Sequence, residues 1–473
     1  MKKACAFGRR PSRREVLKYG MYGAAAASLA PYVWVGGCGK SAGVNKPNII
    51  LVTVDTLRAD HLGCYGYAKD TSPFIDKFAQ ESLVYENCFS QAPVTGSSFA
   101  SILSGYLPHE TMVYENLPLP GEVETIEKSL QGQGYQTAAV VSNFMLQRQW
   151  GWAEGFHYFD DELLTREKNR DYYESIARQT TERSLNILNK LTSGPMFLWI
   201  HYQDPHGPYT PPSGFGEQFK DARERHRPLW INQGVSGYGG IPSYQKLGIN
   251  TDYHYYVSQY DGEIRYMDEE FGRLVQGLKK LGRYDNSLII FTADHGEGMG
   301  ENDYYFAHGE NLHRSLLHVP LMVRYGSDLK GRRRDYVQHI DIVPTIHNFM
   351  DLESELQFRG ADLLAAPKLH RELFAEMSSP LNSDGPKFCL MKDNCKLIYT
   401  PIKNQYQMFD VSQDLEEKRN LFDSAEYRPR TQDLQARLAD IRHENLLGEE
   451  ITNEMPELSP ADREILRALG YVR

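Results

Sequence analysis

The chain of 473 residues is 41% hydrophobic and 24% charged, with a formal net charge of −10 at pH 7. This length is large for one domain and predicts a large domain with a smaller one. The first 37 residues carry seven Lys or Arg and one acid, so the rest of the chain has a formal charge of −16. An acidic body excludes nucleic acid as a partner, because contacts with phosphates need a basic surface.

The N-terminal segment predicts export from the cytoplasm. Residues 12–18 read SRREVLK, and residues 19–35 are moderately apolar and rich in Ala and Gly. A paired arginine before an apolar region is typical of a twin-arginine export signal. The apolar stretch is too short and too rich in Gly for a transmembrane helix, which needs about 20 apolar residues. We expect the mature protein in the periplasm or another extracytoplasmic compartment.

Small residues directly precede Cys38 in VWVGGCGKS, which looks like a bacterial lipoprotein cleavage box. Cleavage there would remove residues 1–37 as a signal peptide and leave Cys38 as an acylated N-terminus on a membrane surface. Plain cleavage without a lipid is the alternative. Four cysteines follow Cys38, too few for a disulfide scaffold, and Cys389 and Cys395 either pair across a hairpin or remain free thiols.

Short apolar runs rich in Val and Ile alternate with helical patterns along residues 46–350. This alternation predicts an α/β domain with a mainly parallel sheet and helices on both faces. A helical period of apolar residues predicts a long helix over residues 260–280. The clearest predicted strands are Asn48–Val54, Thr137–Val141, Met196–Tyr202, Ser287–Ala293 and Val319–Tyr325.

Two other segments interrupt or follow this pattern. Gly207 to Asp252 is rich in Gly, Pro and aromatic residues, and a loop of that length is often a lid or a binding wall. From about Asp351 the pattern changes to short strands such as PKFCLMK, CKLIYT and YQMFDV. We therefore expect residues 351–473 to form a smaller antiparallel α+β subdomain, closed by a helix around residues 461–469.

Polar residues follow the predicted strands, where ligands bind in open α/β sheets. Asp55 follows the first strand, and Asp294 and His295 follow the fourth. Two carboxylates at neighbouring strand ends repel each other unless a cation lies between them, and an imidazole adds a nitrogen ligand. The hydroxyl of Thr95 could complete the shell. Read singly, Asp55 is equally consistent with a helix N-cap. An ordinary turn is the less favoured alternative for Asp294 and His295, because they stand at a strand end.

Residues 92–105 read APVTGSSFASILSG, a loop of small residues that enters a short apolar helix and stops at a glycine. Thr95 at its start is either a helix cap or a nucleophile placed where the helix N-terminus stabilises negative charge. We expect Ser97 and Ser98 to be caps. His206 in DPHGPY and His308 in FAHGE are open to a structural or a substrate-contacting role.

The motifs occur in an order that resembles the sulfatase family of the alkaline phosphatase superfamily. They are NIILVTVDTLRADHLGCYGY, TSPFIDKFAQES, APVTGSSFASILSGYLPHE, HYQDPHGPY, YDGEIRYMDEEFGRL, FTADHGEGMGE, VPLMVRY and the closing MFDVSQDLEEKRNLFD. The resemblance covers nearly the whole mature chain. It implies an alkaline-phosphatase-like α/β sandwich with a catalytic domain over residues 46–350.

The same resemblance implies roles for single residues. It implies a divalent metal ion, Mn²⁺, Mg²⁺, Zn²⁺ or Ca²⁺, held by Asp55, Asp294 and His295. Thr95 falls at the nucleophile position. His206 and His308 fall where the family contacts the transferred group or protonates the leaving oxygen. One ion is the default, although Asp204 with the two histidines could assemble a second.

The chain departs from the family pattern at two places. Sulfatases carry C-x-P-S-R or S-x-P-S-R, whose first residue is oxidised to formylglycine, whereas this chain has Thr95 there and Phe99 in place of the Arg. Thr56 replaces the second aspartate of the metal site. Threonine cannot yield the aldehyde, and relatives with a threonine nucleophile act at phosphorus.

The sequence thus predicts a metal-dependent ester hydrolase or transferase that acts on phosphate esters or diesters of a small molecule, glycan or lipid headgroup. The first alternative is a sulfate ester hydrolase that works without formylglycine. The second is a catalytically inactive lipoprotein that binds a glycan or lipid, but a binding module has no need for the complete set of Asp55, Thr95, Asp294 and His295.

Overall fold

A computed structural model of the protein describes residues 46–114, 117–166, 173–191, 194–352, 356–368, 370–378, 384–447, 451, 453–454 and 459–468. The predicted export signal and Cys38 lie outside these residues. None of the described helices is both long and apolar enough to span a bilayer.

The strands of the described residues form one large sheet, one small sheet and two short pairs. They are β1 Asn48–Val54, β2 Leu83–Phe89, β3 Gln136–Val140, β4 Tyr158–Asp160, β5 Thr165–Arg166, β6 Tyr173–Glu174, β7 Met196–Tyr202, β8 Trp230–Ile231, β9 Gly240–Ile241, β10 Ser287–Ala293, β11 His318–Arg324, β12 Gly331–Gln338, β13 Leu373–Met377, β14 Lys387–Lys392, β15 Cys395–Thr400 and β16 Gln405–Asp410. The α-helices are α2 Pro73–Gln80, α3 Thr95–Ser104, α4 Pro108–Thr111, α5 Ile126–Gly132, α6 Ala177–Lys190, α7 Tyr253–Lys280, α8 Arg314–Leu317, α9 Ile342–Phe349, α10 Arg428–Ile441 and α11 Pro460–Ala468.

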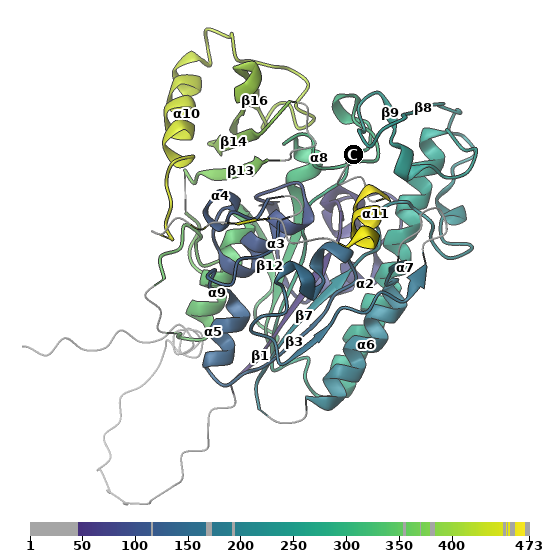
Figure 1. Ribbon diagram of the computed structural model, residues 1–473, viewed down its shortest axis with the longest axis vertical. Coiled ribbons are helices and arrows are strands. Elements are labelled where there is room, and N and C mark those ends of the chain that lie inside the picture. Colours follow the sequence, from purple (N-terminus) through teal and green to yellow (C-terminus); the bar gives the residue numbers. More distant parts are fainter. Residues whose placement is uncertain are drawn as a thin grey trace, which may run out of the picture.

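The large sheet has the strand order β12-β2-β11-β10-β1-β7-β3-β4, and helices cover both faces (Figure 1). Helices α3, α5 and α9 lie on one face, and α2, α6 and α7 on the other. Strands β1, β7 and β10 are buried along their whole length, because a central parallel strand is covered on both sides. The predicted α/β fold with a large, mainly parallel sheet is therefore confirmed.

Strand β11 differs from the expected parallel arrangement. It pairs antiparallel with both β10 and β2, because residues 294–317 stay at one edge of the sheet and return the chain without a crossover helix. The sequence prediction also missed β2 and β12, which pair parallel with each other at the other side of β11. Helix α7 begins at Tyr253, seven residues before the predicted start at residue 260.

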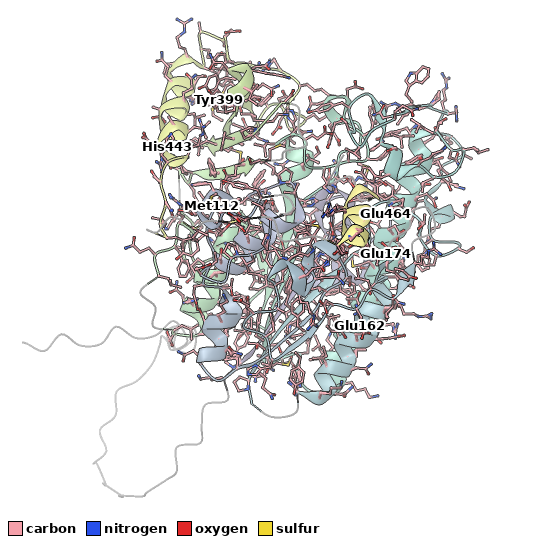
Figure 2. All side chains as sticks on the ribbon, viewed as in Figure 1. Met112, Glu162, Glu174, Tyr399, His443 and Glu464 are labelled. Atoms are coloured by element: carbon pink, nitrogen blue, oxygen red, sulfur yellow. The ribbon has the colours of Figure 1, made fainter. Side chains whose placement is uncertain are left out.

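The small sheet has the order β13-β14-β15-β16 and is antiparallel throughout, as expected. Helix α10 packs on it through Leu434, Leu438 and Ile441. The helix predicted to close this subdomain is α11, and it lies elsewhere. Leu466 of α11 is fully buried in the core of the large sheet, and Figure 2 shows Glu464 far from Tyr399 of the small sheet. Cys389 and Cys395 are free thiols.

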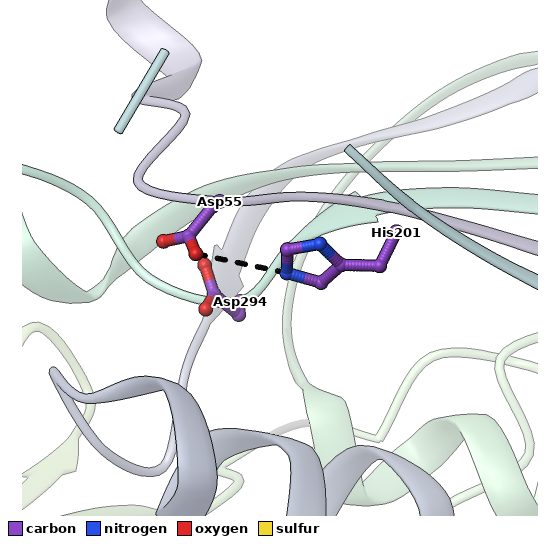
Figure 3. A group of neighbouring side chains, drawn as sticks. All are labelled: Asp55, His201 and Asp294. Carbon is purple, nitrogen blue, oxygen red and sulfur yellow. Dashed lines mark ion pairs between the residues drawn. The ribbon is translucent and has the colours of Figure 1, made fainter. Parts of the chain in front are cut away.

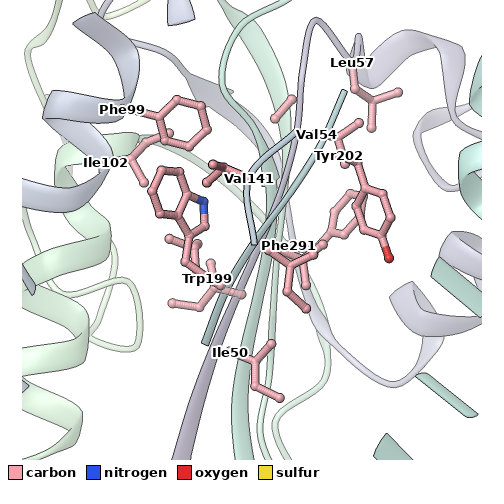
Figure 4. Packing of buried hydrophobic residues seen from close by; sticks show 14 of the residues in the cluster. Ile50, Val54, Leu57, Phe99, Ile102, Val141, Trp199, Tyr202 and Phe291 are labelled. Carbon is pink, nitrogen blue, oxygen red and sulfur yellow. The ribbon is translucent and has the colours of Figure 1, made fainter. Parts of the chain in front are cut away.

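The core of the large sheet fixes which side chains face each helix layer. Side chains alternate along a strand, so Trp199 and Tyr202 of β7 point to opposite faces (Figure 4). Trp199 packs against Phe99 of α3, with the two ring centroids 5.0 Å apart. His201 shares the face of Trp199, so it also points toward α3.

Candidate active site

Three neighbouring central strands, β10, β1 and β7, end at the same level, at the carboxyl-terminal end of the large sheet. Val54 of β1 is in register with Ala293 of β10 and with Tyr202 of β7. The residues that follow, Asp55 and Asp294, therefore meet beyond the carboxyl ends of adjacent strands (Figure 3). The sequence prediction that these two carboxylates come together is confirmed by the geometry.

Asp55 is completely buried, and only one of its two carboxylate oxygens is hydrogen-bonded to a described residue. Asn143 Nδ2 donates to Asp55 Oδ2 at 2.7 Å, and Oδ1 has no hydrogen-bond partner among the described residues. Burial and the nearby charge of Asp294 raise the pKa of Asp55 well above its usual range, and the Asn143 hydrogen bond opposes that shift. The site thus holds a carboxylate that lacks a compensating positive charge.

Asp294 and His295 each have one side-chain atom that is paired and one that is not. The backbone N–H groups of Thr56 and His295 donate to Asp294 Oδ1 at 3.1 and 2.8 Å. His295 Nδ1 lies 2.9 Å from the carbonyl oxygen of Gly296, and because a carbonyl can only accept, Nδ1 carries the proton. Burial lowers the pKa of His295, and its Nε2 lies 3.5 Å from Asp294 Oδ2. A divalent cation bound by both atoms would give each of them a partner.

His201 is a site residue that sequence analysis missed. Its Nε2 lies 3.7 Å from Asp55 Oδ2, and one ligand atom each of Asp55, His201 and Asp294 lie within 4.8 Å of one another (Figure 3). Burial lowers the pKa of His201 to about 4, so the ring is neutral at pH 7. The one feature of the sequence that could have indicated His201 is its place as a polar side chain in the otherwise apolar or aromatic strand MFLWIHY.

The donor set fits one divalent cation. Among the described residues, the buried atoms without a hydrogen-bond partner include Asp55 Oδ1, Asp294 Oδ2, His295 Nε2 and Thr95 Oγ1. Carboxylate, imidazole and hydroxyl groups are common ligands of divalent ions. Buried polar atoms without partners are rare in folded proteins, so their accumulation at one strand edge indicates a bound ligand. Asp55, His201 and Asp294 are the one group of three candidate ligands within the described part of the chain. Asp204, His206 and His308, which were considered for a second ion, do not belong to this group, and neither does His295.

Thr95 stands at the first position of α3. Val94 is the N-cap, and no side chain caps this helix, so neither Thr95 nor the serines act as the expected cap. Ser98 Oγ instead donates to the backbone oxygen of Asp294 at 2.7 Å, which fixes α3 against the site. Thr95 Oγ1 is buried and makes no hydrogen bond to a described residue. A buried hydroxyl without a partner at a helix N-terminus is available to a ligand.

His206 and His308 lie next to this centre. The His308 ring is 4.5 Å from that of His295 and 5.3 Å from that of His206, measured between centroids. Glu297 connects the group, because Oε1 lies 3.2 Å from His308 Nδ1 and Oε2 accepts from Tyr209 OH at 3.1 Å. Thr95 belongs to the same region through α3, which the hydrogen bond from Ser98 ties to Asp294.

Thr56, where the family has a second aspartate, has a strained backbone. Its φ is 53°, a left-handed conformation that β-branched residues rarely adopt. Tyr260 OH donates to the Thr56 carbonyl oxygen at 2.7 Å and holds this conformation. Such strain costs about 1–3 kcal/mol and is concentrated at functional sites.

The long segment from Gly207 to Asp252 contains the short strands β8 and β9 rather than a featureless loop. It reaches the histidine cluster through Tyr238, whose ring lies 4.8 Å from that of Tyr304. Tyr304 OH in turn donates to the carbonyl oxygen of His308 at 2.8 Å. The segment therefore borders the site.

Comparisons with known proteins identify the family and the fold of the chain. A family model for sulfatases matches residues 47–352, and a model for the C-terminal part of N-sulphoglucosamine sulphohydrolase matches residues 300–444. The N-acetylglucosamine-6-O-sulfatase of Bacteroides thetaiotaomicron is 24% identical to the chain, over 84% of this chain and 86% of its own length.

Two solved structures share the fold. One is a complex of a protein with its substrate D-glucosamine-2-N,6-O-disulfate, with a TM-score of 0.70 and 20% identity over 86% of this chain and 100% of that one. The other is the phosphonate monoester hydrolase of Agrobacterium radiobacter, with a TM-score of 0.69 and 18% identity over 87% of this chain and 100% of that one. Because the sulfatase model covers more than half of its length, the chain belongs to the sulfatase family of the alkaline phosphatase superfamily and is an ester-bond hydrolase.

Proposed function

We propose that the chain is a metal-dependent ester hydrolase that uses Thr95 as its nucleophile and prefers phosphate esters or diesters. Enzymes of this family typically bind a divalent metal ion. Asp55, Asp294 and His295 would hold one such ion, with Thr95 in its shell. The observation that carries the proposal is Thr95 Oγ1, a buried hydroxyl at the start of α3 without a partner among the described residues.

A bound divalent cation supplies charge neutralisation at the transferred group and lowers the pKa of a hydroxyl that contacts it. Thr95 Oγ forms a bond to phosphorus while the bond from phosphorus to the leaving oxygen breaks, and its proton passes to solvent. His206 or His308 gives a proton to the leaving oxygen, and Glu297 holds the His308 ring in place. Water then attacks the threonine ester, returns a proton to the histidine and, after protonation of Oγ, regenerates Thr95. An acceptor alcohol in place of water would make the enzyme a transferase.

The preference for phosphorus follows from the nucleophile. A formylglycine hydrate expels sulfate when it collapses to an aldehyde, whereas a threonine ester must be cleaved by a second attack at the transferred atom. Phe99 also replaces the arginine that sulfatases place beside the site. The shared fold with a phosphonate monoester hydrolase supports phosphorus chemistry on this scaffold.

Sulfate ester hydrolysis is the second candidate. It is supported by the family model and by curated relatives such as the N-acetylglucosamine-6-O-sulfatase. An inactive binding protein is the third candidate. It is disfavoured by the buried oxygen and nitrogen atoms that lack partners where the strands end. The substrate for either active form would be the ester of a small molecule, a glycan or a lipid headgroup.

We also propose that the protein is exported by the twin-arginine pathway and anchored by lipid at Cys38, on the basis of SRREVLK and VWVGGCGKS. The Cys38→Ala variant should then move from the membrane fraction to the soluble extracytoplasmic fraction. A membrane fraction equal to that of wild type would argue against the lipid anchor.

The decisive experiment compares aryl phosphate monoester, phosphodiester and sulfate ester side by side, with Mn²⁺, Mg²⁺, Zn²⁺ or Ca²⁺ added. The proposal expects the phosphodiester or monoester to be turned over fastest, and Thr95→Ala to lose activity by at least about 1000-fold. Thr95→Ser keeps the hydroxyl and should retain activity within about tenfold. Faster sulfate turnover would favour the second candidate, and a fully active Thr95→Ala would exclude Thr95 as the nucleophile.

A further inference from the structure

His201 is a buried histidine that lies between α3 and the strand ends of the site. Its exposed fraction is zero, and both ring nitrogens lack a partner among the described residues. Leaving a buried donor or acceptor unpaired costs about 1–3 kcal/mol for each group. The buried His318, by contrast, has a partner, because its Nε2 donates to the carbonyl oxygen of Glu86 at 2.8 Å.

The position of His201 is fixed by its surroundings. Its backbone pairs with Thr53 of β1, and its carbonyl oxygen accepts from Ser142 Oγ at 2.8 Å. The Phe99 ring lies 5.1 Å from the imidazole, between centroids, and occupies its α3 side. Thr95 precedes Phe99 by one helical turn and therefore lies on the same side of α3. His201 is thus held beside both the carboxylates and the proposed nucleophile.

The distance between His201 and Asp55 indicates a shared ion. At 3.7 Å, Nε2 and Oδ2 are too far apart for a hydrogen bond. Two ligands bound at about 2.1 Å to one first-row ion are separated by at most about 4.2 Å. Asp55 Oδ2 already accepts from Asn143, and no hydrogen bond joins His201 to this carboxylate.

From these contacts we infer that His201 is a second nitrogen ligand of the cation and that it makes the site select Zn²⁺ or a similar late first-row ion over Ca²⁺. The inference rests on the proposed metal-dependent function and specifies which ion that function uses. With His201 and His295 the site offers two imidazoles and two carboxylates, together with the Thr95 hydroxyl. Ca²⁺ prefers an all-oxygen shell, whereas imidazole suits Zn²⁺ and its neighbours.

The test measures metal binding rather than turnover, on the full mature chain with the Thr95→Ala substitution. In that background X-ray absorption of the Zn²⁺-loaded protein should report two imidazole ligands, and His201→Asn should report one. His201→Asn should bind Zn²⁺ at least about 100-fold more weakly while its weaker Ca²⁺ affinity changes less than about threefold. His201→Asp restores an additional oxygen ligand and should shift the preference toward Ca²⁺.

His347 provides the matched control, because it is also a buried histidine whose two ring nitrogens lack partners among the described residues. No ion pair joins it to a carboxylate within the part of the chain that the structure describes, so His347→Asn should leave Zn²⁺ affinity unchanged. Circular dichroism would confirm that all variants are folded. Equal Zn²⁺ affinity in His201→Asn and wild type, or a single imidazole in the His201-containing protein, would overturn the inference. Two imidazole ligands, together with no phosphate ester turnover by the Zn²⁺-loaded protein that retains Thr95, would instead refute the proposed function and leave this inference standing.

Discussion

Two buried charged clusters in the molecule are built on opposite principles. Next to the small sheet, Glu417 accepts from Lys396 Nζ at 2.7 Å, from His313 Nδ1 at 2.8 Å and from the Arg314 backbone N–H at 3.0 Å. Burial alone would raise the pKa of Glu417, but Lys396 and His313 lower it to about 2. At the carboxyl-terminal end of the large sheet, Asp55 has no Lys, Arg or protonated His paired with it among the described residues, and its pKa is raised.

The contrast separates structural charge from functional charge. A buried carboxylate whose oxygens are all paired stabilises the packing around it, and it has no capacity left for a ligand. A buried carboxylate with a free oxygen, beside a second carboxylate, destabilises the protein until a cation binds. A buried carboxylate therefore has opposite effects on folding in the two places.

The largest expected effect is the loss of activity in Asp55→Asn. This change removes one of two repelling charges and keeps an acceptor for Asn143, so the metal-free protein should be as stable as wild type or more stable. Activity should fall by at least about 1000-fold, because the cation loses a ligand. Steady-state kinetics and unfolding by guanidinium in EDTA would measure the two quantities. A stability loss in EDTA would show that the charge of Asp55 does not destabilise the metal-free protein.

Glu417→Ala should have the opposite effect, with a large loss of stability and no loss of kcat. Removing one partner of a buried ion pair costs about 3–5 kcal/mol of unfolding free energy. The folded fraction should keep wild-type kcat, because Glu417 is not part of the proposed site. The adjacent Glu416→Ala removes an exposed carboxylate and should change stability by less than about 0.5 kcal/mol. Similar stability in both variants would mean that the paired cluster contributes nothing to folding.

Acid should destabilise the protein through histidines that are buried away from the cation. Burial lowers the pKa of His318 to about 3, so between pH 6.5 and pH 3 the unfolded chain binds a proton there and the native protein does not. Stability therefore falls as the pH drops through this window. From pH 7.5 to pH 5, wild type should lose about 2 kcal/mol more than His318→Asn. Denaturant titrations of both proteins at the two pH values would show the difference, and parallel losses would exclude it.

The smallest effect is expected for Asn143→Ala. Asn143 does not contact the proposed ion, but it orients Asp55 from the N-cap of the short helix over residues 144–146. Loss of such a supporting hydrogen bond lowers metal affinity or activity by about 10–100-fold. Asn189→Ala removes the same group from the exposed face of α6 and should change neither. Unchanged metal affinity in Asn143→Ala would show that Asp55 needs no support.

Strand-end residues were the predictable part of the site. Asp55 and Asp294 follow apolar runs, and parallel strands bring such positions to one edge, so local patterns sufficed. His201 and Asn143 could not be found in that way. Their roles depend on the registers of β7 with β1 and β3, which bring residues 88 and 146 positions from Asp55 into contact with it.

The fold shows the same division. The buried strands β1, β7 and β10 were read from their continuous apolar sequences, whereas the mixed sequences of β2 and β12 carry no clear period. The direction of β11 depends on how residues 294–317 fold back, which no strand pattern encodes. Helix α11 was expected beside the small sheet because it follows that sheet in the chain, but Leu466 is buried in the other core.

The left-handed backbone at Thr56 has a consequence for how this site can change. Aspartate tolerates positive φ better than a β-branched residue does, so Thr56→Asp would relieve strain and add an oxygen ligand in a single substitution. The backbone at residue 56 therefore already has a conformation that suits aspartate, and this one substitution would give the site a third carboxylate beside Asp55 and Asp294.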